Sequence, residues 1–219
     1  MDKREIAESA ILTLEKLYPD AKCTLDYREP YELLFAARLA AQCTDARVNI
    51  VTKTLFKQYT TLQSFADAYI TELETVIRPC GFYKTKAMHI KAAAEMLIRS
   101  FGGEIPQTMD DLLRLPGIGR KTANLIMGDI WGKPAIVTDT HCIRITGRLG
   151  LTSSIEPTKV ESELSKLIPP EKSSDFCHRI VEFGRDICRA RSPLCRKCPM
   201  DCRSRPVNGT AVPRPMPSG

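Results

Sequence analysis

The sequence predicts an all-α protein, on three observations. Apolar residues recur at helical spacing along most of the chain. No sustained alternation of apolar and polar residues, the pattern of a half-buried strand, recurs. Glycines and prolines fall where the periodic segments begin or end. With 219 residues, 43% of them hydrophobic and 26% charged, the chain can bury the core of one large globular domain or two small ones.

The first two expected helices occupy residues 4–18 and 30–43. Residues 4–18 place these apolar side chains on one face: Ile6, Ile11, Leu14 and Leu17. Pro30 suits the first turn of a helix, where its missing N–H would have no partner anyway, and strong helix formers follow it.

Three more helices are expected, over residues 84–101, 110–115 and 173–188. The first has the apolar stripe Ala87, Ile90, Ala94 and Leu97, and two glycines, 102 and 103, end it. The last begins with serine caps and carries the apolar stripe Phe176, Ile180, Phe183 and Ile187. The β-branched residues of segment 135–150 suit either a strand or a helix.

Charge and hydropathy restrict the class of protein. Lys+Arg exceeds Asp+Glu by 32 to 26, a net charge of +6, which permits a polyanionic partner without requiring one. The N-terminus lacks the apolar core of a signal peptide, and the longest Ala- and Leu-rich stretch is charged and too short to span a bilayer. We therefore expect a soluble cytoplasmic protein that has no membrane partner and keeps its thiols reduced.

The stretch "LPGIGRKTA", residues 115–123, predicts a helix-hairpin-helix, in which a Gly-Ile-Gly turn joins two helices. Gly117 and Gly119 allow close approach to another backbone. The amides that start the second helix, from Arg120 onward, have no partner within the helix and can donate to a phosphate. Such contacts grip a nucleic-acid strand without reading its bases. A plain turn between two helices is the alternative.

Lys121 follows the hairpin directly. It is either a solvated surface charge or a nucleophile, because the positive end of a helix dipole and partial burial lower the pKa of an amine. A free amine can form a Schiff base with a sugar carbon, and a carboxylate must then assist proton transfer. Asp139 in "VTDTHC" offers that carboxylate, although a helix N-cap also explains it.

Four of the nine cysteines lie within fifteen residues, "CRARSPLCRKCPMDC": Cys188, Cys195, Cys198 and Cys202. Such a cluster in a reducing compartment predicts a metal centre, either zinc or a [4Fe-4S] cluster, rather than disulfides. The other five cysteines stand apart and suit small buried positions.

Together, "LPGIGRKTANLI", "DTHCIRITGRLGL" and the four cysteines resemble the endonuclease III family of helix-hairpin-helix DNA glycosylases. The upstream segments "YELLFAARLAAQCTDARVN" and "GFYKTKAMHIKAAAEML" are similar to that family as well, so that the resemblance covers residues 1–202. It implies a two-lobed fold: a helical barrel domain with the hairpin at 23–134, and an iron-sulfur cluster domain at 1–22 plus 135–202. The Pro-rich segment 203–219 is expected to be a disordered tail.

The resemblance also implies an activity. The family flips a damaged pyrimidine out of duplex DNA, removes it and cuts the strand 3′ to the abasic site. Lys121 matches its nucleophile and Asp139 its assisting carboxylate. The implied protein is a monomeric DNA N-glycosylase and abasic-site lyase of base excision repair, acting on oxidised pyrimidines in double-stranded DNA and associated with the nucleoid when bound.

Further positions carry over from the family. Gln42 matches the residue that fills the hole left by the flipped nucleotide, and Phe82 stands where the family has a leucine wedge. A surface amide and a core aromatic are their alternatives. Arg189 and Arg191 match the basic residues that a cluster loop presents to DNA.

The sequence departs from the family at three places. Ala40 replaces a common serine, Phe82 replaces the leucine, and the gap between Cys198 and Cys202 is three residues instead of the usual five. The four-cysteine pattern otherwise matches the family's [4Fe-4S] cluster.

Two other functions fit parts of the pattern. A monofunctional mismatch glycosylase lacks a lysine at position 121 and carries an extra C-terminal domain. A non-catalytic helix-hairpin-helix binder needs neither Lys121 nor Asp139.

Overall fold

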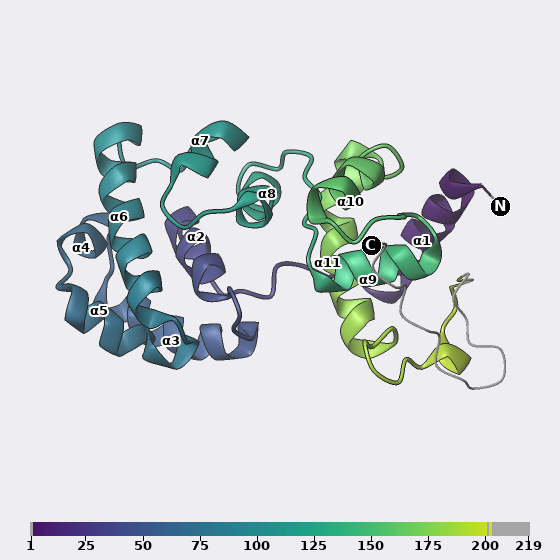
Figure 1. Cartoon of the computed structure of the whole chain (residues 1–219), viewed down its shortest axis with the longest axis horizontal. Coiled ribbons are helices and arrows are strands. Elements are labelled where there is room, and N and C mark those ends of the chain that lie inside the picture. The colour runs from purple at the N-terminus through teal and green to yellow at the C-terminus, as the bar shows by residue number, and fades with distance from the viewer. Residues whose placement is uncertain (1, 201, 203–219) are drawn as a thin grey trace, which may run out of the picture. The chain divides into compact units, whose positions relative to one another are not determined.

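The computed structural model describes residues 2–200 and 202, and within them the protein is all-α, as predicted. The described residues form two compact units, and no strand occurs among them (Figure 1). We call residues 23–133 the middle unit, and residues up to 22 together with those from 134 onward the terminal unit.

The middle unit holds seven of the α-helices and one 3-10 helix. Its elements are α2 (Pro30–Leu39), α3 (Asp45–Gln58), α4 (Leu62–Asp67), α5 (Ile70–Ile77), η1 (Arg78–Cys80), α6 (Tyr83–Phe101), α7 (Met109–Arg114) and α8 (Arg120–Asp129). The long helix α6 packs against α2, α4 and α5, so it is the central helix of this unit.

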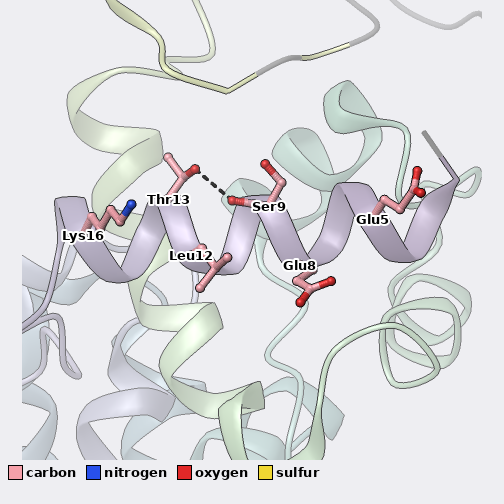
Figure 2. Close-up of a pocket in the computed structure, with 6 residues that line it drawn as sticks. All are labelled: Glu5, Glu8, Ser9, Leu12, Thr13 and Lys16. Carbon is pink, nitrogen blue, oxygen red and sulfur yellow. Dashed lines mark hydrogen bonds between the residues drawn. The ribbon is translucent and has the colours of Figure 1, made fainter.

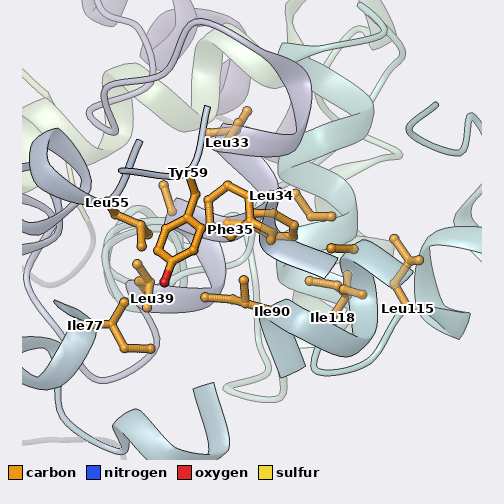
Figure 3. Packing of buried hydrophobic residues seen from close by; sticks show 14 of the residues in the cluster. Leu33, Leu34, Phe35, Leu39, Leu55, Tyr59, Ile77, Ile90, Leu115 and Ile118 are labelled. Carbon is orange, nitrogen blue, oxygen red and sulfur yellow. The ribbon is translucent and has the colours of Figure 1, made fainter. Parts of the chain in front are cut away.

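Aromatic rings fill the centre of the middle unit. The ring centroids of Phe35 and Phe65 lie 4.8 Å apart, and those of Tyr59 and Phe65 lie 5.1 Å apart. Leu39 of α2, Ile90 of α6 and other aliphatic side chains close the core around them, as Figure 3 shows. Leu115 and Ile118 of the hairpin belong to the same core. The hairpin is therefore part of the packed structure rather than a loop attached to it.

The terminal unit is built around a second core. Its elements are α1 (Lys3–Leu17), α9 (Thr140–Leu149), α10 (Pro157–Leu164), η2 (Pro170–Lys172), α11 (Ser173–Asp186) and η3 (Cys195–Lys197). Helix α11 packs against both α1 and α9, so helices from the two ends of the chain share one apolar interior.

Most expected helices are found close to their expected bounds, with three differences. The second helix ends at Leu39, before residue 43. Leu17, expected in the buried stripe of α1, is exposed, and Ala7 and Ala10 are buried beside Ile6 and Leu14 instead. The 135–150 segment is helical only from Thr140, because Asp139 caps a helix there.

The expected tail, residues 203–219, lies outside the described residues. Across the residues described, no helix combines the length and the apolar character needed to cross a bilayer.

Candidate nucleic-acid interface and active site

Helices α7 and α8 pack against each other and form the expected helix-hairpin-helix. Thr108 caps α7, and its hydroxyl accepts the amide of Asp111 at 3.2 Å. The amide of Ile118 donates to the carbonyl of Leu115 at 3.1 Å, which closes the turn. Because Leu115 and Ile118 are both buried, the turn is anchored by apolar side chains on either side of Gly117.

Gly117 needs to be a glycine for two reasons. Its φ is +75°, a conformation that side chains disfavour. A Cβ there would also lie 2.4 Å from Nδ1 of His89 and 2.7 Å from Nε of Arg38. Arg38 Nε donates to that same His89 nitrogen at 3.2 Å, and burial, then the charge of Arg38, lowers the pKa of His89. The hairpin backbone therefore rests directly on an Arg38–His89 pair supplied by α2 and α6.

Gly119 differs from Gly117. It is the N-cap of α8 with a φ of −103°, an extended conformation open to any residue, and a Cβ there would meet no atom within 4 Å. Nothing inside the described protein demands a glycine at this position. Having no side chain, Gly119 itself supplies no capping oxygen to the first turn of α8, and the space that a side chain at this position would enter is open.

Lys121 is an exposed residue in the first turn of α8, two positions after that cap. The partial burial expected for its amine is not found. Arg120 beside it is exposed as well, so two basic side chains flank the start of α8. A helix start whose N-cap residue has no side chain, beside two cations, is suited to a phosphate group.

Asp139 belongs to the terminal unit and caps α9. Its Oδ1 accepts the amide of Cys142 at 2.7 Å, so the capping interpretation of this residue is correct. Its second oxygen, Oδ2, makes no hydrogen bond within the described part of the chain, and the residue is half-buried. One carboxylate can thus cap a helix with one oxygen and keep the other for a ligand.

Gln42 and Phe82 share an unusual backbone conformation. Only three non-glycine residues within the described range have positive φ, and these are two of them, at 56° and 47°. Both residues are exposed, and Phe82 is 66% exposed, so the core alternative for Phe82 is wrong. A bulky residue in the left-handed region costs roughly 1–2 kcal/mol. Ala40, two residues before Gln42, is the ordinary helical C-cap of α2.

Lys86 is a buried cation that sequence reasoning missed. Its side chain is 1% exposed, and its ammonium donates to the carbonyls of Leu39 and Cys80, each at 2.8 Å. One signal could have found it: Lys86 lies one helical turn before Ile90, in register with the apolar stripe of α6.

The cysteine segment follows α11. The amide of Leu194 donates to the carbonyl of Ile187 at 2.9 Å and closes a loop that begins with Cys188. Arg148 of α9 places Nη1 3.2 Å from the sulfur of Cys188 and 2.9 Å from the carbonyl of Arg189. Cys188, Cys198 and Cys202 all pack against the core of the terminal unit, while Arg189 and Arg191 are exposed.

The donor chemistry of these residues suits a metal centre, although the side chains are not gathered around one point. None of the nine cysteines forms a disulfide, so all four thiols are chemically available. Among residues 2–200 and 202, no three His, Cys, Asp or Glu side chains stand together as a metal site. Of the five separate cysteines, Cys80, Cys142 and Cys177 are fully buried, as expected, and Cys23 and Cys43 are half-buried.

A shallow surface hollow lies along the outer face of α1 (Figure 2). None of the candidate residues lines it, and the Thr13 hydroxyl drawn there donates to the Ser9 carbonyl of the same helix at 2.8 Å. The lining residues are Glu5, Glu8, Ser9, Leu12, Thr13 and Lys16. This hollow contributes nothing to the candidate site.

Comparisons with known proteins agree with one another. Residues 35–170 match the family described as HhH-GPD superfamily base excision DNA repair protein. The chain is 45% identical to endonuclease III of Synechocystis sp. over 197 residues, 90% of each chain. It is 42% identical to endonuclease III of Bacillus subtilis over 185 residues, 84% of each. A solved structure of a trapped endonuclease III–DNA covalent intermediate is similar with a TM-score of 0.87 and 44% identity, covering 93% of this chain and 96% of that one.

The two hairpin glycines should respond differently to substitution. We expect Gly117→Ala to lower the free energy of unfolding of the middle unit by about 2 kcal/mol, because it combines an unfavourable φ with a displaced Arg38–His89 hydrogen bond. Gly119→Ser should change it by no more than about 0.5 kcal/mol, since serine is a good N-cap. Urea unfolding followed by the fluorescence of Trp131, the one tryptophan, reports on this unit. Equal losses in the two variants would contradict the distinction.

Proposed function

The chain belongs to the endonuclease III family, and on that premise we propose that it removes oxidised pyrimidines from duplex DNA and then cuts the strand. It is a bifunctional DNA glycosylase and abasic-site lyase of base excision repair. The observation that carries the proposal for this chain is local: an exposed lysine follows a hairpin whose second glycine the fold itself does not need. A non-catalytic binder has no use for that lysine, and a monofunctional glycosylase lacks it.

The hairpin supplies the grip on DNA. Gly117 fixes the turn, and the open N-terminus of α8 at Gly119 lets a phosphate approach the first-turn amides, with Arg120 beside it. Such contacts set the register of a DNA strand without reading its sequence. A phosphate held here lies next to the residue that follows, Lys121.

Lys121 is the nucleophile in this proposal. Its amine forms a bond to C1′ of the flipped nucleotide while the bond from C1′ to the base breaks, and the base leaves with the electron pair and gains a proton. The sugar ring then opens to a Schiff base with the Lys121 nitrogen. Loss of a 2′ proton expels the 3′ phosphate, and hydrolysis of the Schiff base returns the free amine.

Asp139 assists these steps. A carboxylate stabilises the positive charge that develops on the sugar as the base departs, and it accepts and returns protons. Support comes from the geometry of its cap: Oδ1 is used by the Cys142 amide and Oδ2 is not. Because this cap fixes the direction of the carboxylate, the second oxygen is held in one orientation.

Gln42 and Phe82 act on the DNA stack. Exposed side chains on left-handed backbone persist only where the surrounding structure imposes them, and such strain concentrates at functional sites. We assign Gln42 to the space left by the flipped nucleotide and Phe82 to a wedge between neighbouring bases.

The four cysteines would hold a [4Fe-4S] cluster that shapes the basic loop between Cys188 and Cys195. When bound, the cluster would cross-link that loop through the four thiolates. Arg189 and Arg191 are exposed on the loop and contact DNA phosphates in this proposal. The predicted cluster domain, at 1–22 plus 135–202, then corresponds to the terminal unit, and the predicted helical barrel domain, at 23–134, corresponds to the middle unit; the two divisions differ at residue 134, which belongs to the terminal unit.

The partner of the protein is damaged double-stranded DNA. We place the enzyme in the cytoplasm, associated with the nucleoid when bound to DNA, and we assign it a monomeric state. The exposed basic residues of the hairpin and the cysteine loop support a polyanionic partner.

Lys121→Gln should abolish the covalent adduct that borohydride traps between the protein and a duplex with one abasic site. The variant keeps a helix-forming residue at an exposed position, so its fold and DNA binding are expected to persist. Mass spectrometry detects the adduct. Lys57, in α3, is also an exposed lysine, so Lys57→Gln is the matched control and should form the trapped adduct at the wild-type rate.

Asp139→Asn separates capping from chemistry. Asparagine caps a helix as well as aspartate does, so stability should change by less than about 0.5 kcal/mol. Base excision should fall about 100-fold or more, because the charge is lost. Single-turnover release of an oxidised pyrimidine measures the rate. A variant with unchanged stability and unchanged excision would reduce Asp139 to a helix cap.

Gly119→Ser should weaken binding to duplex DNA about tenfold. The serine hydroxyl would accept hydrogen bonds from the same first-turn amides that donate to a phosphate. Fluorescence anisotropy at several salt concentrations measures the affinity. Unchanged affinity in the variant would mean that these amides do not contact the phosphate.

The metal content of the purified protein distinguishes the two candidate centres. A [4Fe-4S] cluster gives about four iron atoms and an equal amount of acid-labile sulfide per chain. A zinc site gives zinc and no sulfide. Elemental analysis of protein prepared without oxygen decides between them, and replacing Cys188 by serine should lower the iron content.

A further inference from the structure

The ammonium group of Lys86 is buried between the ends of two helical segments. Lys86 lies in the first turn of α6, and its Nζ donates to the carbonyl of Leu39 and to that of Cys80, each at 2.8 Å. Leu39 is the last residue of α2, and Cys80 is the last residue of η1. One cation therefore joins two chain segments about forty residues apart in sequence.

Elementary electrostatics explains the choice of a lysine. The last carbonyls of a helix have no partner within it and carry the negative end of its dipole, so a cation there is favourable. Burial nevertheless disfavours the charged form, and this desolvation lowers the pKa of Lys86. A buried ammonium is costly unless its hydrogen bonds are made. Lys86 therefore stabilises one particular arrangement of the two carbonyls far more than any other.

Leu39 and Cys80, which carry these two carbonyls, lie shortly before the two residues that we assign to the DNA stack. Gln42 follows Leu39 by three residues, and Phe82 follows Cys80 by two. Each lies on left-handed backbone with its side chain exposed. Strained residues of this kind keep their conformation only if the flanking backbone is held. The two Lys86 hydrogen bonds hold the flanking backbone of both.

We propose that Lys86 is a positioning residue, whose two hydrogen bonds set the separation between Gln42 and Phe82 so that both enter the DNA stack around one flipped nucleotide. This inference rests on the proposed function. It assigns Lys86 no contact with DNA and no part in the covalent steps at Lys121.

Lys91 offers a matched control on the same helix. Its ammonium likewise donates to two backbone carbonyls, those of Ala66 and Ala68, the latter at 3.1 Å. Ala66 lies in the last turn of α4 and Ala68 is its C-cap, in a part of the chain that carries none of the candidate DNA-binding residues. Loss of Lys91 therefore removes a similar contact without touching the loops of Gln42 and Phe82.

The test compares two substrates for the Schiff-base reaction in the full-length protein. A nucleotide in duplex DNA must leave a stack and have its place filled, whereas an abasic site in a single strand has no partner strand to leave. We expect Lys86→Met to trap the duplex site about 10- to 100-fold more slowly, as small misplacements in a site do, and the single-stranded site at the wild-type rate. Lys91→Met should trap both substrates at the wild-type rates.

A second measurement detects the entry of protein side chains into the DNA stack. 2-Aminopurine placed opposite the abasic site changes its fluorescence when protein side chains enter the stack, and Lys86→Met should lose that change at saturating protein. Lys86→Gln, which is shorter and uncharged, is compared in the same way and serves if the methionine variant does not fold, as judged by circular dichroism at the assay temperature.

The outcomes separate this inference from the proposed function. A wild-type ratio of duplex to single-strand rates in the Lys86 variants, or an equal drop in Lys91→Met, would overturn the role of Lys86. A wild-type protein that traps neither substrate would instead overturn the proposed chemistry at Lys121.

Discussion

The close approach of Gly117 to the Arg38–His89 pair is the contact on which the candidate site of the middle unit depends. It joins α2, α6 and the α7–α8 hairpin at one point, because Arg38, His89 and Gly117 come from these three parts. Nδ1 of His89 accepts this hydrogen bond because a guanidinium group can only donate, and burial, then the charge of Arg38, lowers the pKa of His89. Any side chain at position 117 would have to displace the Arg38 and His89 side chains or shift the hairpin that leads to Lys121.

The loops that carry Gln42 and Phe82 show how a stable scaffold retains strained residues. A left-handed glutamine or phenylalanine would relax to ordinary backbone in a free loop. Here the loops begin at helix ends whose last carbonyls are bound by a buried ammonium, so relaxation would leave that charge unpaired in an apolar interior. The stability of the middle unit therefore maintains the exposed conformation of these two side chains.

Asp139 has a structural role as a helix cap and also the chemical role that we propose, and this limits what a motif can reveal. The sequence predicts both a helix cap and a carboxylate for chemistry, and local pattern alone favours the first. The structure shows the cap without removing the second role, since one oxygen makes it and the other is unused. The two hairpin glycines look alike in sequence for a similar reason, although only Gly117 has a conformation and neighbours that require glycine.

The sequence by itself determined the all-α class, most helices and the membership of the family, because apolar periodicity, caps and motifs are local properties of the chain. It left the 135–150 segment open and placed Leu17 in the core, since propensity and period do not say which neighbours cover a residue. Only the tertiary structure decided that Phe82 is exposed on left-handed backbone, that Lys86 is buried and that Gly117 touches His89. Each of these depends on segments distant in sequence meeting in space, and backbone conformation there is imposed by packing rather than by the residue itself.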